Sequence, residues 1–321
     1  MRRHQCGICH NTVGNKSYRV REMLFGTREN FDYFQCSSCQ CLQISTPPEN
    51  LDAYYPENYY SFHREVLPQP RSWKRYLKRK RTQYFLGDTS LIGKILTVIH
   101  GEPLLDAWAK NARLRIDSHI LDVGCGNGHL LSRLANEGFT RLTGIDPFFT
   151  REVNTPCGFQ THKRTIEEES DCFDFVMLHH TFEHVTNPEA TLRAIHKATK
   201  PDGRVLIRIP VISWAWEHYG VHWVGIDAPR HFWIHSLKSM ELLCESCGFA
   251  VESIQYDSTG FQFWGSEQYM KNIPLENELS AWTGRSQIIF SERQMQTWEQ
   301  AAQSLNEEKR GDQACFFLIK K

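Results

Sequence analysis

The chain has 321 residues and equal numbers of basic and acidic side chains, 37 of each, so its formal net charge is zero. Apolar residues make up 40% and charged residues 23%, a balance that excludes a disordered chain and a membrane bundle. Because proteins that depend on phosphate contacts are usually basic, the zero charge also disfavours nucleic acid as the main partner.

The eleven cysteines suggest metal binding or packing more than disulfides. No apolar signal core follows Met1, and the longest apolar run, 91–99, is too short to span a bilayer. We therefore expect a reducing, cytoplasmic compartment, where disulfides are rare.

The N-terminal segment, 1–46, carries two C-x2-C pairs, and their members are Cys6, Cys9, Cys36 and Cys39. Each pair forms a turn whose thiolates converge, so two pairs give a tetrahedral four-sulfur site that suits zinc or iron. Strand-like segments at 18–20 and 31–34 lie between the pairs, as in a zinc ribbon, which predicts a zinc-binding module. Four thiolates leave no open position, so we expect a structural zinc, with Cys41 and less plausibly His10 as competing ligands.

Residues 47–110 have the composition of a linker followed by a helical segment. Tyrosines gather at 54–60, where they either stack on a ligand ring or pack the N-terminal module against the main domain. Residues 71–81 carry seven basic side chains, with apolar residues interleaved at helical spacing, and this predicts a basic amphipathic helix. The helix face is either simply solvated, in peripheral contact with an anionic membrane, or in contact with an anionic substrate.

The main domain, 111–321, begins with an apolar strand that ends in a glycine-rich turn containing Gly124, Gly126 and Gly128. Without side chains, these positions let the backbone turn tightly and approach a ligand closely. Asp122 precedes the turn, and the next strand ends at Asp146, whose carboxylate can accept hydrogen bonds from ribose hydroxyls. This order of strand, glycine loop, helix, strand and acid predicts a doubly wound α/β sheet.

The other apolar runs agree with this fold class. Strands are expected at 119–124, 141–145, 157–161, 173–178, 204–210, 249–256 and 313–319. Helices are expected at 128–137, 189–198 and 236–247. Residues 257–310 form an insertion before the last strand, with a helix over 291–308 that either covers the acceptor pocket or forms a homodimer surface.

These motifs resemble the class I S-adenosylmethionine-dependent methyltransferases, and the matching segments are 121–128, 144–146, 173–178, 182–188 and 200–207. The resemblance implies a Rossmann-like seven-stranded sheet with S-adenosyl-L-methionine against the glycine loop. The cofactor-binding residues that it implies are Asp122, Gly124, Gly126, Gly128, Asp146, Pro147, His179 and His180. A dinucleotide-binding protein is the competing interpretation, and the segments at 182–188 and 200–207 argue against it.

An aromatic and histidine-rich segment, 214–235, follows the strand expected at 204–210. Because ligands of open sheets bind beyond the carboxyl ends of the strands, this segment is the expected acceptor site. Its rings suit the apolar face of a sugar, while His and Glu side chains reach the hydroxyls. The alternative is an aromatic lid that only packs.

The cysteine-rich module ahead of this domain is similar to that of zinc-containing sugar methyltransferases of deoxysugar and surface-polysaccharide biosynthesis. In that family, a Glu-His pair before an aromatic–aromatic–x–Ser stretch supplies a catalytic His. The matching stretch here is 231–236, which makes His231 the candidate base, with His222 and Glu217 as second candidates. Arg230 replaces the Glu, which favours O-methylation and offers a cation for the phosphate of a sugar nucleotide.

We therefore expect a methyltransferase that acts on a hydroxyl or carbon of a sugar or sugar nucleotide, in surface-polysaccharide or secondary-metabolite biosynthesis. The alternatives are an O-methyltransferase for quinones or phenols, a nucleic-acid methyltransferase, and a non-catalytic cofactor-binding scaffold. Base-amine methyltransferases of nucleic acids usually carry an Asn/Asp-Pro-Pro-aromatic loop, and this chain has 179–182, His-His-Thr-Phe, at that place.

Overall fold

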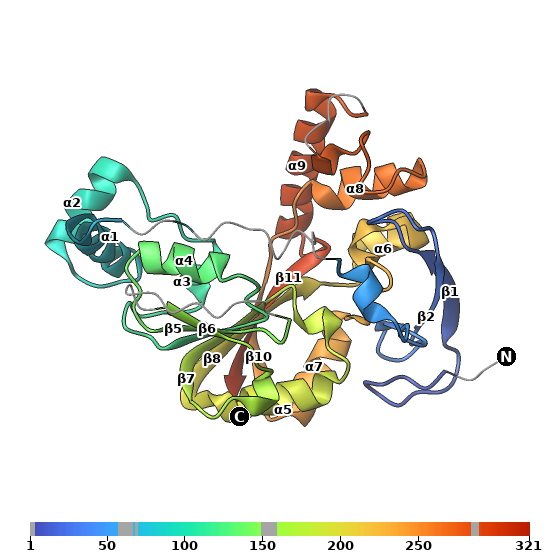
Figure 1. The fold of residues 1–321 in the computed structure, drawn as a ribbon, viewed down its shortest axis with the longest axis horizontal. Helices are drawn as coiled ribbons and strands as arrows, with labels where there is room; N and C mark the ends of the chain where they lie inside the picture. Colours follow the sequence, from blue (N-terminus) through green and yellow to red (C-terminus); the bar gives the residue numbers. More distant parts are fainter. Residues whose placement is uncertain (1–3, 57–66, 68–69, 149–158, 284–288) are drawn as a thin grey trace.

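The computed structural model describes residues 4–56, 67, 70–148, 159–283 and 289–321, which form two sheets flanked by helices (Figure 1). The larger sheet has seven strands in the order β10-β11-β8-β7-β4-β5-β6. Its strands are β4 (Ile120–Val123), β5 (Leu142–Ile145), β6 (Phe159–His162), β7 (Phe173–His179), β8 (Thr199–Pro210), β10 (Phe249–Tyr256) and β11 (Gln313–Lys320). Strands β4 to β8 pair in parallel, and β11 is antiparallel to both β8 and β10. The predicted fold class is confirmed.

The central strands are short and apolar because helices cover both faces of the sheet. Successive residues of a strand point to opposite faces, so Leu121 and Ile120 belong to different core clusters. Helices α5 (Pro188–Ala198) and α7 (Leu237–Ser246) supply the first cluster, whereas α3 (Trp108–Asn111) and α4 (His129–Asn136) supply the second. Such two-sided burial is typical of parallel sheets.

Helix starts follow side-chain caps that are visible in the sequence. The side chains of Asn187, Ser236 and Ser291 accept hydrogen bonds from the backbone N–H groups three residues later, at the starts of α5, α7 and α9 (Glu292–Glu307). The helices expected at 128–137, 189–198, 236–247 and 291–308 begin and end within one residue of those in the structure. Strand β8 starts earlier than predicted, at Thr199, because this residue already pairs with Phe173 of β7.

The smaller sheet combines three strands of the N-terminal module with one strand of the main domain. Its strands are β1 (Lys16–Arg21), β2 (Asn30–Gln35), β3 (Leu42–Ile44) and β9 (Trp233–Ile234), in that order. Strand β9 comes from the aromatic segment of the main domain and pairs antiparallel with β3. The sheet of the N-terminal module is thus completed by the main domain.

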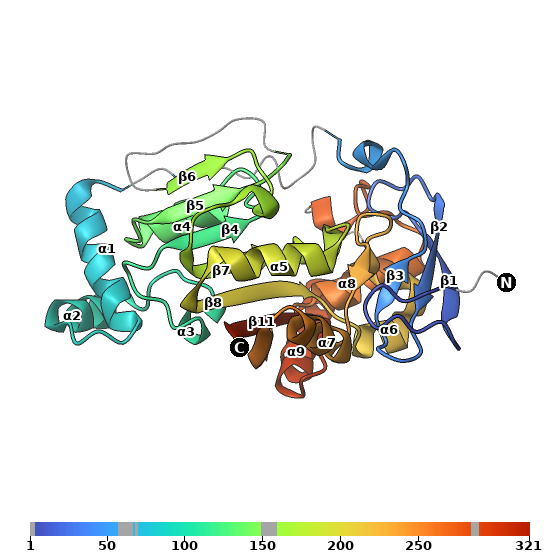
Figure 2. The same cartoon turned by 90° about the horizontal axis from the view of Figure 1, so that it is seen from below.

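The segment before the sheet contains the 3-10 helix η1 (Leu51–Tyr54) and two helices, α1 (Ser72–Phe85) and α2 (Leu91–His100). In Figures 1 and 2 the α1–α2 hairpin lies at one end of the molecule and the N-terminal module at the other. The predicted basic helix is confirmed and extends to Phe85. Of the tyrosine cluster, Tyr59 and Tyr60 lie outside the described residues, as does Cys157.

Further elements pack beyond the larger sheet. They are the helices α6 (Trp214–Tyr219) and α8 (Phe261–Met270) and the 3-10 turns η5 (Gly220–His222), η6 (Val224–Ile226) and η7 (Ala281–Thr283). The predicted insertion contains α8 and α9, which share a small apolar cluster around Phe263 and Ala302. No helix in the described ranges is long and apolar enough to cross a membrane.

Candidate active site

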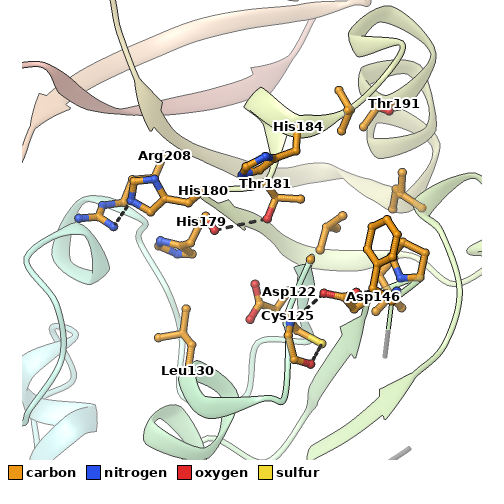
Figure 3. Close-up of a pocket in the computed structure, with 18 of the residues that line it drawn as sticks. Asp122, Cys125, Leu130, Asp146, His179, His180, Thr181, His184, Thr191 and Arg208 are labelled. Atoms are coloured by element: carbon orange, nitrogen blue, oxygen red, sulfur yellow. Dashed lines mark hydrogen bonds between the residues drawn. The ribbon is translucent and has the colours of Figure 1, made fainter. Parts of the chain in front are cut away.

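A cavity of about 860 Å³ lies at the carboxyl ends of β4, β5, β7 and β8 (Figure 3). Its lining includes Tyr55, Asp106, Trp108, Asp122, Gly124, Cys125, Gly126, Asn127, Leu130, Arg133, Asp146, Pro147, Phe148, Ile166, His179, His180, Thr181, His184, Thr191, Arg208 and Asp257. Open parallel sheets bind ligands at this edge, and of the eight residues that the resemblance implies for the cofactor, all but Gly128 line the cavity.

The glycine loop needs its glycines. Gly124 has φ +75°, Gly126 +52° and Gly128 +81°, a region that other residues rarely adopt. A Cβ atom on Gly124 would also lie 2.3 Å from Oγ1 of Thr181, across the cavity wall. The loop therefore approaches the β7 end closely and keeps the cavity open to a ligand.

Asp146 is fixed by two backbone hydrogen bonds, from Gly126 N at 3.0 Å and Phe148 N at 2.9 Å. Each carboxylate oxygen still has a lone pair for a ligand hydroxyl. Burial raises the pKa of Asp146, although the two N–H donors oppose this rise. Burial raises the pKa of Asp122 to about 8, and the charge of Asp146 adds to the effect. Two carboxyl groups on one wall suit a cationic ligand that carries hydroxyls.

The opposite wall is formed by histidines from the end of β7 and the following 3-10 helix η4 (Phe182–His184) (Figure 3). Nδ1 of His180 lies 3.3 Å from Oε1 of the buried Glu183, and Nε2 accepts a hydrogen bond from Arg208 at 2.9 Å. Arg208 also forms an ion pair with Asp257 at 2.6 Å. Burial lowers the pKa of His179 well below its ordinary value, so that imidazole is neutral.

The tautomer of His184 is set by a backbone carbonyl. Its Nδ1 lies 2.9 Å from the carbonyl oxygen of Arg230, which can only accept, so Nδ1 carries the proton and Nε2 can take one. The hydroxyl of Tyr55 lies 3.1 Å from the same nitrogen. Burial, and next the charge of His231, lower the pKa of His184 to about 4. The ring is therefore a neutral base at physiological pH.

The predicted base, His231, lies directly behind His184, with ring centroids 4.7 Å apart. Its Nδ1 is 2.9 Å from the carbonyl oxygen of Gly225, and its Nε2 is 3.9 Å from Oε1 of Glu183. Burial opposes ionisation of Glu183, but the hydrogen bond from His180 and the neighbouring imidazoles hold its pKa down at about 2. His231 thus faces a buried carboxylate and is not among the lining residues.

The second candidates lie elsewhere. Glu217 is on α6 and His222 is on η5, in the segment that packs against the N-terminal module, and neither lines the cavity. A catalytic role for His231, His222 or Glu217 stays a prediction.

The interpretation of Arg230 as a phosphate ligand is wrong. Its side chain is fully buried, and its guanidinium lies 2.6 Å from Asp227 and 3.2 Å from Glu22. The Glu22 carboxylate also accepts four backbone N–H groups, from residues 24–27. Arg230 therefore ties a loop of the N-terminal module to the main domain.

The aromatic segment 214–235 does not form the expected acceptor wall. Trp216, Trp223 and Phe232 are buried in a cluster with residues of β1, β2 and β3. No described residue between 209 and 256 lines the cavity. The alternative of an aromatic segment that only packs is the one that the structure supports, because the module's apolar sheet covers these rings.

The four cysteine thiols of the two C-x2-C pairs come together, with every Sγ within 4.8 Å of the others. The Sγ atoms of Cys6 and Cys39 are 3.5 Å apart, and those of Cys9 and Cys36 are 3.4 Å apart. Backbone N–H groups of residues 8, 9, 38 and 39 donate to the first cysteine of each pair. Cys41 is buried but lies outside this group of four.

Sequence reasoning missed several cavity residues. His184 lies within the matching segment 182–188, so the Glu-His pair that follows the strand expected at 173–178 was an available signal. Tyr55 belongs to the tyrosine cluster for which contact with a ligand was one of two interpretations, and it lines the cavity, whereas Arg208 and Asp257 carry no motif and reach the cavity only through the fold.

Comparison with known proteins agrees with this geometry. A methyltransferase domain family matches residues 99–254. The ubiquinone biosynthesis O-methyltransferase of Sodalis glossinidius is 30% identical over 171 residues, which are 48% of this chain and 68% of that protein. The protein of the same name from Pseudomonas putida strain GB-1 is 33% identical over 114 residues, 32% of this chain and 49% of that protein. The chain thus spans about two thirds of the first relative and half of the second.

Solved structures give a further likeness. A crystal structure of a SAM-dependent methyltransferase from Methanosarcina mazei has 19% identity and a TM-score of 0.38, covering 48% of this chain and 89% of that chain.

Proposed function

The chain belongs to the class I S-adenosylmethionine-dependent methyltransferases, and on that premise we propose that it methylates a hydroxyl group of a small-molecule acceptor. The observation that carries the proposal is His184, a half-buried neutral imidazole whose Nε2 can take a proton, on the cavity wall opposite the glycine loop. Methylation of a hydroxyl requires removal of its proton, and a neutral imidazole is suited to that task.

The residues at the glycine loop fit the cofactor. Asp146 would hold the ribose hydroxyls, while Asp122 and the loop backbone would border the methionine part. S-adenosyl-L-methionine, when bound, supplies an electrophilic methyl group on a sulfonium sulfur. The protein's own task is then to align the acceptor oxygen with that methyl group and to exclude water.

We assign the acceptor proton to Nε2 of His184. The charge that develops on this ring faces His231 and the Glu183 carboxylate behind it. A buried carboxylate stabilises an imidazolium, as the orienting acid of a catalytic triad does. His231 acts in this scheme as a positioning residue between His184 and Glu183, which modifies its predicted role as the base.

A phenol or quinol is the acceptor class that we favour. Relatives at about 30% identity are named as ubiquinone biosynthesis O-methyltransferases. Aromatic rings of Tyr55, Trp108 and Phe148 line the cavity and can stack on a planar ring. A sugar or sugar nucleotide, as in polysaccharide biosynthesis, is the second candidate, supported by the polar pairs Arg208–Asp257 and Arg133–Asp106 at the same cavity.

We also propose that the four clustered cysteines hold a structural zinc ion. Their number and spacing suit tetrahedral thiolate coordination, and N–H groups directed at the sulfurs stabilise thiolates.

An acceptor panel tests the function. Purified protein with S-adenosyl-L-methionine is assayed for S-adenosylhomocysteine release with a catechol, a hydroquinone, a nucleotide sugar and a short RNA. Turnover with the aromatic diols alone supports the first candidate, and turnover with the sugar alone supports the second. Cofactor binding without product on any acceptor, or product on RNA alone, contradicts the proposal.

A further inference from the structure

Helix α2 presents a stripe of aliphatic side chains to solvent. Its members are exposed by 50% to 81% and are Leu91, Ile92, Ile95, Val98 and Ile99. Their spacing of three and four residues puts them on one face of the helix. A soluble helix normally turns such a face toward a core, so this arrangement calls for a partner.

The stripe faces outward because the other side of α2 is fixed against α1. Gly93 packs so closely that a Cβ atom there would lie 2.3 Å from the carbonyl oxygen of Lys80. Ser90 caps the helix by accepting a hydrogen bond from Gly93 N at 3.1 Å. The orientation of the stripe is therefore built into a well-formed hairpin.

The hairpin is also anchored on the C-terminal end of α4 in the main domain. Lys78 and Arg81 of α1 form ion pairs with the buried Glu137 at 2.7 Å and 3.1 Å. Arg79 donates to the carbonyl oxygen of Gly138 at 2.7 Å. These contacts hold α1 on the end of α4, and α2, which carries the exposed stripe, lies with α1 at one end of the molecule (Figures 1 and 2).

Charge identifies the kind of partner. The hairpin segment 71–100 has one acidic residue, Asp88, and its basic residues are Arg71, Lys74, Arg75, Lys78, Arg79, Lys80, Arg81 and Lys94. Because the whole chain has no net charge, the rest of it is acidic. Trp73 and Tyr76 are more than half exposed, with Lys74 and Lys80 ammonium groups 5.5 Å and 5.6 Å from their ring centroids. Exposed aliphatic, aromatic and basic side chains together are typical of an interfacial helix.

We propose that the α1–α2 hairpin docks the enzyme on an anionic lipid bilayer. The aliphatic stripe of α2 enters the boundary between headgroups and acyl chains, and Lys74 and Lys80 of α1, beside the exposed rings of Trp73 and Tyr76, bind anionic headgroups. Docking here leaves the N-terminal module, at the far end, in water.

The docking surface leads directly to the cavity. The chain leaves α2 at His100 and reaches Asp106 and Trp108, which line the cavity, after a short connector. Leu104 in this connector is 74% exposed. A bilayer at the hairpin would therefore lie beside the cavity rim, where an acceptor that partitions into lipid can enter. The docking itself does not depend on the acceptor class proposed above.

Flotation with vesicles tests the proposal. The full-length protein should float with vesicles of phosphatidylcholine and phosphatidylglycerol at 70:30, and at least tenfold less with phosphatidylcholine alone. The double variant Ile95→Asp, Val98→Asp should lose at least tenfold of the bound fraction, since two charges would enter the acyl region. The double variant Lys74→Glu, Lys80→Glu should lose binding to the anionic vesicles, and any binding that remains should no longer depend on salt concentration.

The matched control is Val13→Asp, which changes an equally exposed valine, 74%, on the N-terminal module and should leave flotation unchanged. Circular dichroism of every variant separates lost docking from lost folding. Equal flotation of wild type and the Ile95→Asp, Val98→Asp variant overturns the proposal. A second outcome also overturns it. If light scattering shows a wild-type dimer and a monomeric variant, and neither protein floats with vesicles, the stripe is a contact between two copies of this chain.

Discussion

The buried guanidinium of Arg230 lies 3.2 Å from the carboxylate of Glu22, 208 residues earlier in the chain. The carbonyl oxygen of the same Arg230 lies 2.9 Å from Nδ1 of His184 in the cavity wall. The N-terminal module is therefore connected through a single residue to the imidazole of His184 in the cavity wall.

This connection predicts that Glu22→Gln destabilises the protein and slows turnover. The substitution leaves a buried cation short of one partner, which costs about 2–4 kcal/mol of unfolding free energy. Urea denaturation measures the loss. Asp32→Asn is the control: it weakens an exposed pair with Arg19 and should cost less than about 1 kcal/mol. Equal costs for the two variants would contradict a structural role for the Glu22–Arg230 pair.

His184→Ala should lower kcat by about 10²- to 10³-fold while cofactor affinity stays within a factor of two, because it removes the proposed acceptor of the proton. His100→Ala changes an exposed histidine at the end of α2, outside the cavity lining, and is the control that should keep full activity. Stopped-assay turnover and calorimetric cofactor binding give the two readouts. Full activity of His184→Ala would remove it as the base.

His231→Ala separates positioning from catalysis. The charge of His231 helps to lower the pKa of His184 to about 4, so His184 in the wild type loses its base function only as pH falls through about 4. Without His231 the pKa of His184 should rise, so the acidic limb of the kcat profile should move to higher pH. A profile of unchanged shape with a uniformly lower rate would instead support His231 as the direct base.

The sequence was most informative where local pattern and chain order decide the structure. The glycine loop, Asp122, Asp146 and the doubly wound fold class follow from short segments, and the structure places the loop and both acids at one edge of the sheet. Two C-x2-C spacings likewise predicted that four thiols converge, and they do.

Sequence patterns did not predict the contacts between segments that are distant in the chain. An aromatic run such as 214–235 is compatible with an acceptor wall or with packing, and the outcome depends on the module that covers it. For the same reason Arg230 was misinterpreted, since its partner Glu22 lies in the loop after β1, far from Arg230 in the chain. The exposed aliphatic stripe on α2 also has the periodicity of a buried one, and only the packing of Gly93 on α1 distinguishes the two.

Zinc content tests the cysteine site. The purified protein should contain one zinc equivalent by mass spectrometry, and Cys36→Ser should lose it together with several degrees of Tm. Cys172→Ser, an exposed cysteine far from the four, should keep both. A chelator should also lower turnover, because β9 and Arg230 connect the module to the cavity wall. Full zinc content in Cys36→Ser would contradict the assignment.

Asp122 predicts a dependence on pH in both stability and cofactor binding. Its pKa in the folded protein is about 8, against an ordinary value of 3.8, so the folded state holds this proton more tightly than the unfolded state. The associated stability is complete below pH 4 and is lost as pH rises through about 8. An amide at this position cannot ionise, so Asp122→Asn does not lose this stability as pH rises. The Tm of the variant minus that of the ligand-free wild type should therefore grow between pH 5 and pH 9. A cationic cofactor favours the ionised carboxylate, so wild-type affinity should rise over the same range while that of Asp122→Asn stays flat. Parallel Tm and affinity curves for the two proteins would show that Asp122 does not titrate in this window.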